Sequence, residues 1–274
     1  ASEYDVQIHI NSRGFRGPEP EPSAGEKVLV LGDSFSFGYG VQDQETIPAR
    51  LEARLRGKFG NFSQALNAGV PGYDTKRELT LLTNIIEEYK PTIVVLQFFI
   101  NDPLSNSGEF FFSPIPTNLL RFIPLNGVTA LLNYAFEYPR KLFFKLELYD
   151  DYRETEHLDC LRVGKCEDGW RSTETYLKNI RALSKQHGAR LVIFHIPSLD
   201  EVRLNQQVDP YDPTLAQQRL NDFASRVGVD FASLASAKKL SVTHYYPRDQ
   251  HLTAEGNDLA AEYLFRTFWG ADAQ

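Results

Sequence analysis

The chain contains the stretch Lys27-Val28-Leu29-Val30-Leu31-Gly32-Asp33-Ser34-Phe35-Ser36-Phe37-Gly38. Its β-branched and Leu residues form a short apolar run that ends at Gly32, which predicts a buried strand. Asp and Ser follow at once, and both are preferred at the start of a helix. A buried strand that leads straight into a helix is typical of a parallel α/β sheet.

The rest of the chain repeats this alternation. Apolar runs predict further strands at 62–67, 92–98, 191–196 and 229–234, and helical spacing predicts helices at 47–58, 79–86, 176–183, 215–227 and 253–268. Strands that alternate with helices form βαβ units, with a mostly parallel sheet and helices on both faces. Such a sheet binds its ligand at the carboxyl ends of the strands.

Composition excludes several classes of protein. The 274 residues carry 29 Lys and Arg against 36 Asp and Glu, a net charge of −7, and 42% are hydrophobic. These values are ordinary for a globular protein and exclude a disordered chain, a collagen-like repeat and a coiled coil. The charge balance is acidic and no run of five basic residues is present, so nucleic acid is not an expected partner. No apolar stretch approaches the roughly 18 residues of a membrane span.

One block, residues 103–170, interrupts the alternation. It has no clear strand, and ten aromatic residues fall within 103–150. We interpret it as an aromatic-rich helical insertion with its own small core; a cap that lines the crevice is the alternative. The expected organisation is a segment at 1–26 that packs on a single domain at 27–274.

The N-terminus and the cysteines bear on location. The first residues have neither a basic start nor an apolar run, so they are not a signal peptide; the chain begins with Ala1, so a signal or membrane anchor could have preceded it. Cys160 and Cys166 can close a small disulfide loop around Gly164, which would indicate an oxidising compartment. Two free thiols are the alternative. Without a nearby His pair the cysteines make a poor zinc site.

Polar or glycine residues follow each of the first three strands. Ser34 lies near a helix start, where backbone N–H groups favour an anion, so it can serve as a nucleophile whose attack creates an oxyanion. Gly72 lies in a glycine turn that can expose an amide, and the Asn101 side chain can donate to an oxyanion. Taken singly, each has a simpler interpretation: a helix cap for Ser34 and turns for the other two.

A histidine with an acidic neighbour precedes the final helix. His251 has Asp249 two residues before it. A general base needs one imidazole nitrogen toward the nucleophile and the other held by a carboxylate. His244 is the nearest rival, and His195 lies within a predicted core strand.

Together these residues resemble the four sequence blocks of the SGNH (GDSL-type) hydrolase superfamily, over 27–268 without the insertion. The blocks are Gly-Asp-Ser at 32–34, the Gly-Val-x-Gly turn at 69–72, Asn-Asp at 101–102 and the Asp/His pair. The resemblance implies a flavodoxin-like three-layer α/β/α sandwich and ester hydrolysis without metal or cofactor. It also implies that Ser34 is the nucleophile, His251 the base and Asp249 its orienting acid. Ser34 and Gly72, through their backbone N–H groups, and Asn101, through its side chain, would form the oxyanion hole.

The chain departs from the family pattern at two positions. Phe99 stands where the family usually has Gly, and Arg248 stands where it more often has the Asp. An Asp two residues before the His resembles extracytoplasmic members that add or remove acetyl groups on polysaccharides, so an extracytoplasmic location is expected. Residues 10–17 also resemble a segment that precedes the domain in membrane-anchored or exported members; an edge strand and loop is the alternative.

The sequence therefore predicts a serine ester hydrolase that removes a short acyl group, such as acetyl, from a polar or carbohydrate alcohol. Phe99 and the mixed aromatic and charged composition of the insertion favour a short acyl group over a lipid. An O-acetyltransferase acting on a polysaccharide is the alternative within enzymes. A catalytically inert carbohydrate-binding protein is the alternative from another class. The oligomeric state is left open.

Overall fold

The computed structural model describes residues 3–21, 25–60, 63–106, 159–204 and 210–270. The predicted insertion at 103–170 falls mostly on residues 107–158, so its aromatic core lies outside the described residues.

The elements follow the predicted alternation. The strands are β1 (Glu26–Gly32), β2 (Ser63–Gly69), β3 (Ile93–Phe98), β4 (Arg190–His195) and β5 (Asp230–Ser233). The helices are α1 (Ser34–Phe37), α2 (Ile47–Phe59), α3 (Thr75–Tyr89), α4 (Asn101–Asn106), α8 (Glu167–Gln186), α9 (Leu199–Leu204), α10 (Leu215–Val227) and α11 (Ala254–Trp269). Short 3₁₀ turns lie at 43–45, 234–236 and 242–244.

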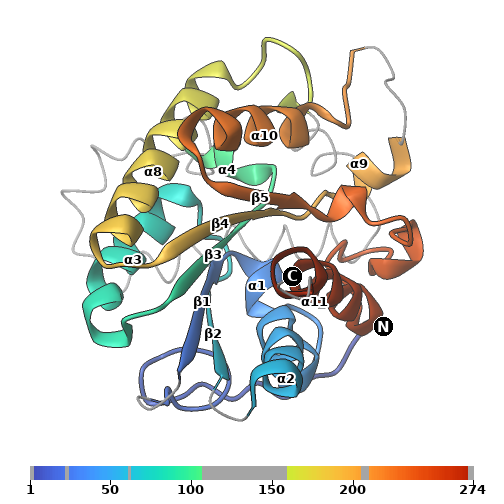
Figure 1. Cartoon of the computed structure of the whole chain (residues 1–274). Coiled ribbons are helices and arrows are strands. Elements are labelled where there is room, and N and C mark those ends of the chain that lie inside the picture. The colour runs from blue at the N-terminus through green and yellow to red at the C-terminus, as the bar shows by residue number, and fades with distance from the viewer. Residues whose placement is uncertain (1–2, 22–24, 61–62, 107–158, 205–209, 271–274) are drawn as a thin grey trace, which may run out of the picture.

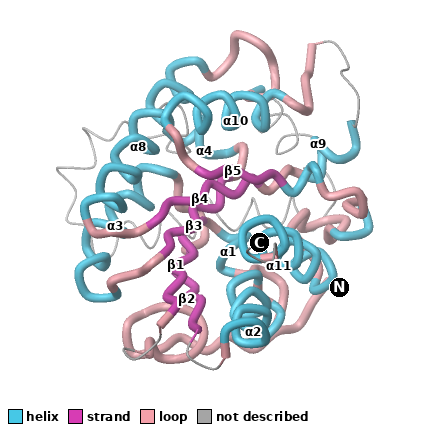
Figure 2. Tube along the Cα trace, viewed as in Figure 1, coloured by secondary structure: helices cyan, strands magenta, loops and turns pink. Residues whose placement is uncertain are grey.

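The five strands form one sheet in the order β2-β1-β3-β4-β5, and every neighbouring pair is parallel. Helices α2 and α11 pack together on one face, and α3, α8 and α10 cover the other (Figure 1). The strands run as a continuous band between these two helical layers (Figure 2). This is the flavodoxin-like strand order, so the predicted α/β sandwich with a parallel sheet is confirmed.

The central strands are buried because they are covered on both faces. Every residue of β3 is buried, as are the last five residues of β1. A strand in this position needs apolar side chains on both sides, which explains the continuous rather than alternating hydrophobic pattern. Thr46, Asp74 and Thr253 begin α2, α3 and α11 by accepting a backbone N–H into their side chains.

The buried face of α3 differs slightly from the face that the helical spacing of Leu79, Leu82, Ile85 and Ile86 predicts. Leu82 and Ile86 are buried as expected, but Leu79 and Ile85 are only partly buried. Glu78 is 1% exposed and takes a central place on the buried face. A carboxylate in this position is not predicted by hydrophobic spacing.

The N-terminal segment is held against the domain by a buried arginine. Arg16 is 2% exposed. Its guanidinium donates to the Asp43 carboxylate at 2.7 Å and to the main-chain oxygens of Phe37, Gly38 and Val41 at 3.1, 2.6 and 2.6 Å. These acceptors surround the loop that follows α1, so Arg16 braces the segment next to Ser34.

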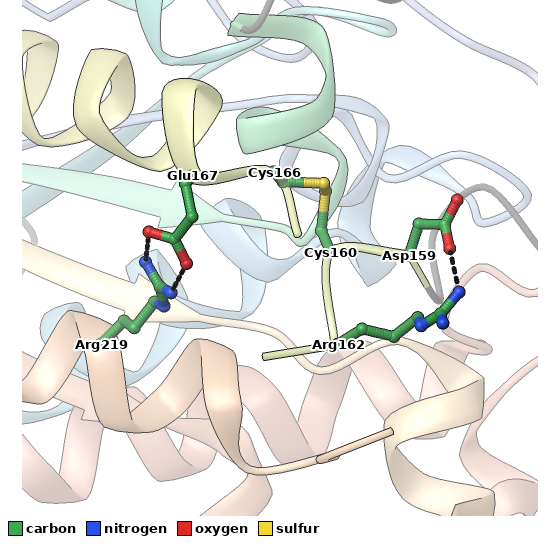
Figure 3. The surroundings of a disulfide bond; sticks show 6 residues. All are labelled: Asp159, Cys160, Arg162, Cys166, Glu167 and Arg219. Carbon is green, nitrogen blue, oxygen red and sulfur yellow. Dashed lines mark hydrogen bonds and ion pairs between the residues drawn. A yellow bond between two sulfur atoms is a disulfide. The ribbon is translucent and has the colours of Figure 1, made fainter. Parts of the chain in front are cut away.

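Cys160 and Cys166 form a disulfide directly before α8. Figure 3 shows it beside the ion pair between Glu167, at the start of α8, and Arg219 of α10. The Leu161 oxygen in the disulfide loop also accepts the Asp212 N–H at 2.8 Å. The loop therefore joins α8 to the segment that leads into α10.

We expect Arg16→Lys to lower the free energy of unfolding by about 2–3 kcal/mol, because one ammonium cannot replace a planar fork that serves four acceptors. Urea denaturation measures this change. Arg13→Lys is the matched control, since Arg13 is half exposed and pairs with Glu88 at the surface. Equal stability losses in the two variants would contradict the bracing role.

Candidate active site

Ser34 stands at the edge of the sheet because β1 passes directly into α1. Asp33 is the N-cap of this short helix, and its Oδ1 accepts the Phe35 N–H at 2.9 Å. Gly69, at the end of β2, makes the tight approach possible: a Cβ there would lie 2.3 Å from the Phe37 nitrogen. Only glycine lets α1 pack this closely on β2.

A buried glutamine in β3 holds the same turn from the other side. Gln97 is 1% exposed, and its side-chain carbonyl accepts the N–H groups of Asp33 and Ser36, both at 3.2 Å. It also accepts the Ser36 hydroxyl at 3.0 Å. These bonds tie the residues on both sides of Ser34 to the centre of the sheet.

Ser34, His251 and Asp249 form one hydrogen-bonded chain. His251 Nε2 lies 2.7 Å from Ser34 Oγ, and His251 Nδ1 lies 2.5 Å from Asp249 Oδ1. A carboxylate only accepts, so Nδ1 carries the proton, which leaves Nε2 to accept the hydroxyl proton of Ser34. The arrangement can take a proton from the serine and stabilise the imidazolium that results.

The surroundings of Asp249 favour the ionised form of its carboxylate. Burial raises its pKa, but hydrogen bonds from His251 and Tyr4 and the charge of His251 outweigh burial and hold the pKa below its usual range. Tyr4 reaches it from the N-terminal segment, donating its hydroxyl to Oδ2 at 2.8 Å. Between Asp249 and His251, Gln250 adopts a φ of +67°, an uncommon conformation for a residue with a Cβ.

Aromatic rings surround the imidazole. The centroids of Phe35 and Tyr39 lie 4.8 and 5.1 Å from that of His251. Phe99, which is 8% exposed, packs on Phe35 at 4.5 Å. The rings of Phe35 and Tyr39 restrict the orientation of His251, and Phe99 backs the ring of Phe35.

The segments that carry Gly72 and Asn101 reach the same edge of the sheet. The Val70 N–H donates to the Gly32 oxygen at 2.9 Å, which joins the glycine turn to the end of β1. Gly72 has a φ of +77°, which favours glycine. Asn101 begins α4, and its Oδ1 is buried without a hydrogen-bond partner among the described residues. Their role as oxyanion donors stays a prediction.

The rival histidines lie elsewhere. His244 Nδ1 contacts the Ser241 hydroxyl at 3.0 Å. His195 ends β4, is fully buried, and contacts Ser233 Oγ at 2.9 Å, with Glu201 3.4 Å from its other nitrogen. Neither ring is joined to Ser34 by these contacts.

A group of carboxyl groups lies buried beneath this edge: Asp33, Asp74, Glu78 and Asp102. Burial, together with the charge of neighbouring carboxylates, raises the pKa of Glu78 and of Asp102 well above the usual range. Asp102 Oδ2 accepts the Thr75 hydroxyl at 2.8 Å, whereas neither oxygen of Glu78 has a hydrogen-bond partner in the described part of the chain. Burial also raises the pKa of Asp33, opposed by the Phe35 N–H.

Within the described ranges, no group of three or more His, Cys, Asp and Glu residues is arranged to hold a metal ion. Over the same residues, no helix is both long enough and apolar enough to cross a membrane.

Three residues of the site were not predicted from the sequence. The sequence gives a weak indication of Gln97, because it is the polar residue in an otherwise apolar strand. The sequence does not indicate which groups its side chain binds. The sequence gives no indication of Glu3 and Tyr4, because they lie about 245 residues from the Asp249 loop that they contact.

A parallel α/β sheet with a Ser–His–Asp hydrogen-bonded chain at its carboxyl edge defines a hydrolase architecture that works through a serine. Residues 30–259 match the model of the GDSL-like lipase/acylhydrolase family, and the chain belongs to this family. The predicted class of protein, a GDSL-type hydrolase, is confirmed.

Curated relatives are esterases. An arylesterase of Vibrio mimicus is 32% identical over 104 residues, which are 37% of this chain and 49% of that protein, about half its length. Esterase TesA of Pseudomonas aeruginosa is 24% identical over 198 residues, 72% of this chain and 85% of that protein.

Solved structures share the fold. The crystal structure of TesA superposes with a TM-score of 0.56 at 14% identity, covering 89% of this chain and 98% of that one. Axe2, an acetylxylan esterase from Geobacillus stearothermophilus, superposes with a TM-score of 0.52 at 16% identity, covering 92% of this chain and 99% of that one.

We expect Glu78→Gln to stabilise the protein at neutral pH. The ordinary pKa of this group is 4.5 and the folded pKa is higher. In the folded chain the Glu78 carboxyl therefore keeps its proton up to a higher pH than in the unfolded chain. The free energy of unfolding falls as the pH rises from the ordinary pKa to the folded pKa. The variant removes this loss, and a gain of about 1 kcal/mol would raise Tm by about 2–4 °C.

Thermal unfolding across pH tests this expectation. The difference between the variant and the wild type should vanish near the ordinary carboxyl pKa and grow toward neutral pH. Glu87→Gln, on the exposed face of the same helix, is the control and should show no such trend. A Tm difference for Glu78→Gln that is constant with pH would contradict the raised pKa.

Proposed function

We propose that the protein is a serine ester hydrolase that works through an acyl-enzyme. The observation that carries the proposal is the chain of contacts from Ser34 Oγ to His251 Nε2 at 2.7 Å and from His251 Nδ1 to Asp249 Oδ1 at 2.5 Å. Family membership and the esterases among its relatives support it.

In this mechanism the Ser34 hydroxyl attacks the ester carbonyl while His251 accepts its proton. The tetrahedral oxyanion is stabilised by the backbone N–H groups of Ser34 and Gly72 and the side chain of Asn101. His251 then gives the proton to the leaving alcohol, and the acyl group remains on Ser34. Water, activated by His251, releases the acid and restores the serine. Asp249 keeps the imidazole in the required tautomer and stabilises its charged form.

The substrate we propose carries a short acyl group, such as acetyl, on a polar or carbohydrate alcohol. Phe99 supports a short acyl group, because its ring packs on Phe35 beside His251 and fills space that a long chain would need. The structural likeness to Axe2, an acetylxylan esterase, is compatible with a carbohydrate ester.

We also propose an extracytoplasmic location. The support is the disulfide between Cys160 and Cys166, since such bonds persist in oxidising compartments and are rare in the cytosol.

Ser34→Ala is expected to lower kcat for an aryl acetate by about 10⁶-fold, with residual activity from binding and the oxyanion donors. An organophosphonate should label the wild type at Ser34 and leave the variant unlabelled. Ser236→Ala is the control, because this serine is exposed and its hydroxyl accepts a hydrogen bond from Gln217, away from the hydrogen-bonded chain of Ser34, His251 and Asp249. Near-full activity of Ser34→Ala in a folded sample would refute the proposal.

The acyl preference is tested with p-nitrophenyl esters from acetyl to dodecanoyl. We expect kcat/KM to be highest for acetyl or butyryl esters in the wild type. In Phe99→Ala the preference should move toward longer chains, with a gain of up to about fourfold per added methylene, equivalent to about 0.8 kcal/mol. A wild-type rise toward octanoyl and longer esters would contradict the short-acyl proposal.

A further inference from the structure

The Asp249 carboxylate is held at both of its oxygens. Oδ1 faces His251 at 2.5 Å, and Oδ2 accepts the Tyr4 hydroxyl at 2.8 Å. The terminal torsion of an Asp side chain has broad, shallow minima, so a carboxylate bound at one oxygen can still rotate. A second donor on the opposite oxygen removes that freedom.

Tyr4 is itself held in place by other rings. Its centroid lies 5.9 Å from Tyr39 in an edge-on contact and 5.1 Å from Tyr246. Gly40 leaves room for the cluster, since a Cβ there would lie 3.0 Å from the Tyr4 ring. Burial and the neighbouring Asp249 charge raise the pKa of Tyr4, so its hydroxyl keeps the proton that it donates.

The residue before Tyr4 holds the backbone of the same loop. The Glu3 carboxylate accepts the N–H of Arg248 at 3.1 Å and that of Asp249 at 2.7 Å. Two consecutive residues of the N-terminal segment therefore contact the Asp249 loop through their side chains. Glu3 binds the main chain of the loop, and Tyr4 binds the side chain of Asp249.

We infer that Tyr4 is a positioning residue of the active site, whose hydroxyl fixes the Asp249 carboxylate in the orientation that receives His251 Nδ1–H. Glu3 supports it by fixing the Asp249 main chain. The inference rests on the proposed roles of Ser34, His251 and Asp249. It gives the N-terminal segment a role in the active site, which Tyr4 exerts through Asp249.

Tyr4→Phe tests the inference, since it removes one oxygen and keeps the ring. We expect kcat for an aryl acetate to fall about tenfold with KM unchanged, because a hydrogen bond to a charged group is lost while substrate contacts remain. The proton resonance of His251 Nδ1–H, measured by NMR on the full chain, should shift or broaden.

Tyr246→Phe is the matched control. Tyr246 lies in the same ring cluster, but its hydroxyl donates to the Gly40 oxygen at 2.9 Å rather than to Asp249. It should leave the Nδ1–H resonance and kcat unchanged. An unchanged resonance and kcat in Tyr4→Phe would overturn the inference, as would equal effects in both variants. The resonance does not depend on turnover, so it tests Tyr4 even if Ser34→Ala refutes the proposed function.

Discussion

The side-chain carbonyl of Gln97 accepts three hydrogen bonds from the turn on which Ser34 stands, and the site depends on that turn. The turn lies between β3, which supplies Gln97, and the end of β2. At the end of β2 it packs so closely on Gly69 that no Cβ would fit there. Most buried polar groups need a partner, and the Gln97 carbonyl finds its partners in this turn, so the carbonyl and the turn determine each other's position. The serine oxygen is then directed toward His251 Nε2.

The other half of the site comes from segments that approach the sheet from outside. His251 and Asp249 lie in a loop before α11, and Glu3 and Tyr4 brace that loop. Arg16 braces the opposite side, next to the nucleophile turn. The N-terminal segment thus contacts Asp249 on one side and the loop that follows the nucleophile turn on the other, which couples the relative position of these two parts to its packing.

The edge of the sheet that carries the site lowers the folding stability of the protein. Buried carboxyl groups with raised pKa values lie beneath it, and Glu78 has no hydrogen-bond partner in the described part of the chain. Local features that oppose stability tend to concentrate at functional sites, where the surrounding structure holds them. The apolar strands β3 and β4 supply that support, since they are buried over almost their whole length.

The sequence by itself determined the alternation of strands and helices, the parallel sheet and the strand ends at which Ser34, Gly72, Asn101, Asp249 and His251 would lie. Hydrophobic periodicity and local capping preferences carry that information, because they act between residues close along the chain. Only the tertiary structure decided that Glu78 faces the core, that Gln97 holds the nucleophile turn and that Tyr4 reaches Asp249. These contacts join residues distant in sequence, and no local preference encodes which distant partner a polar side chain will meet.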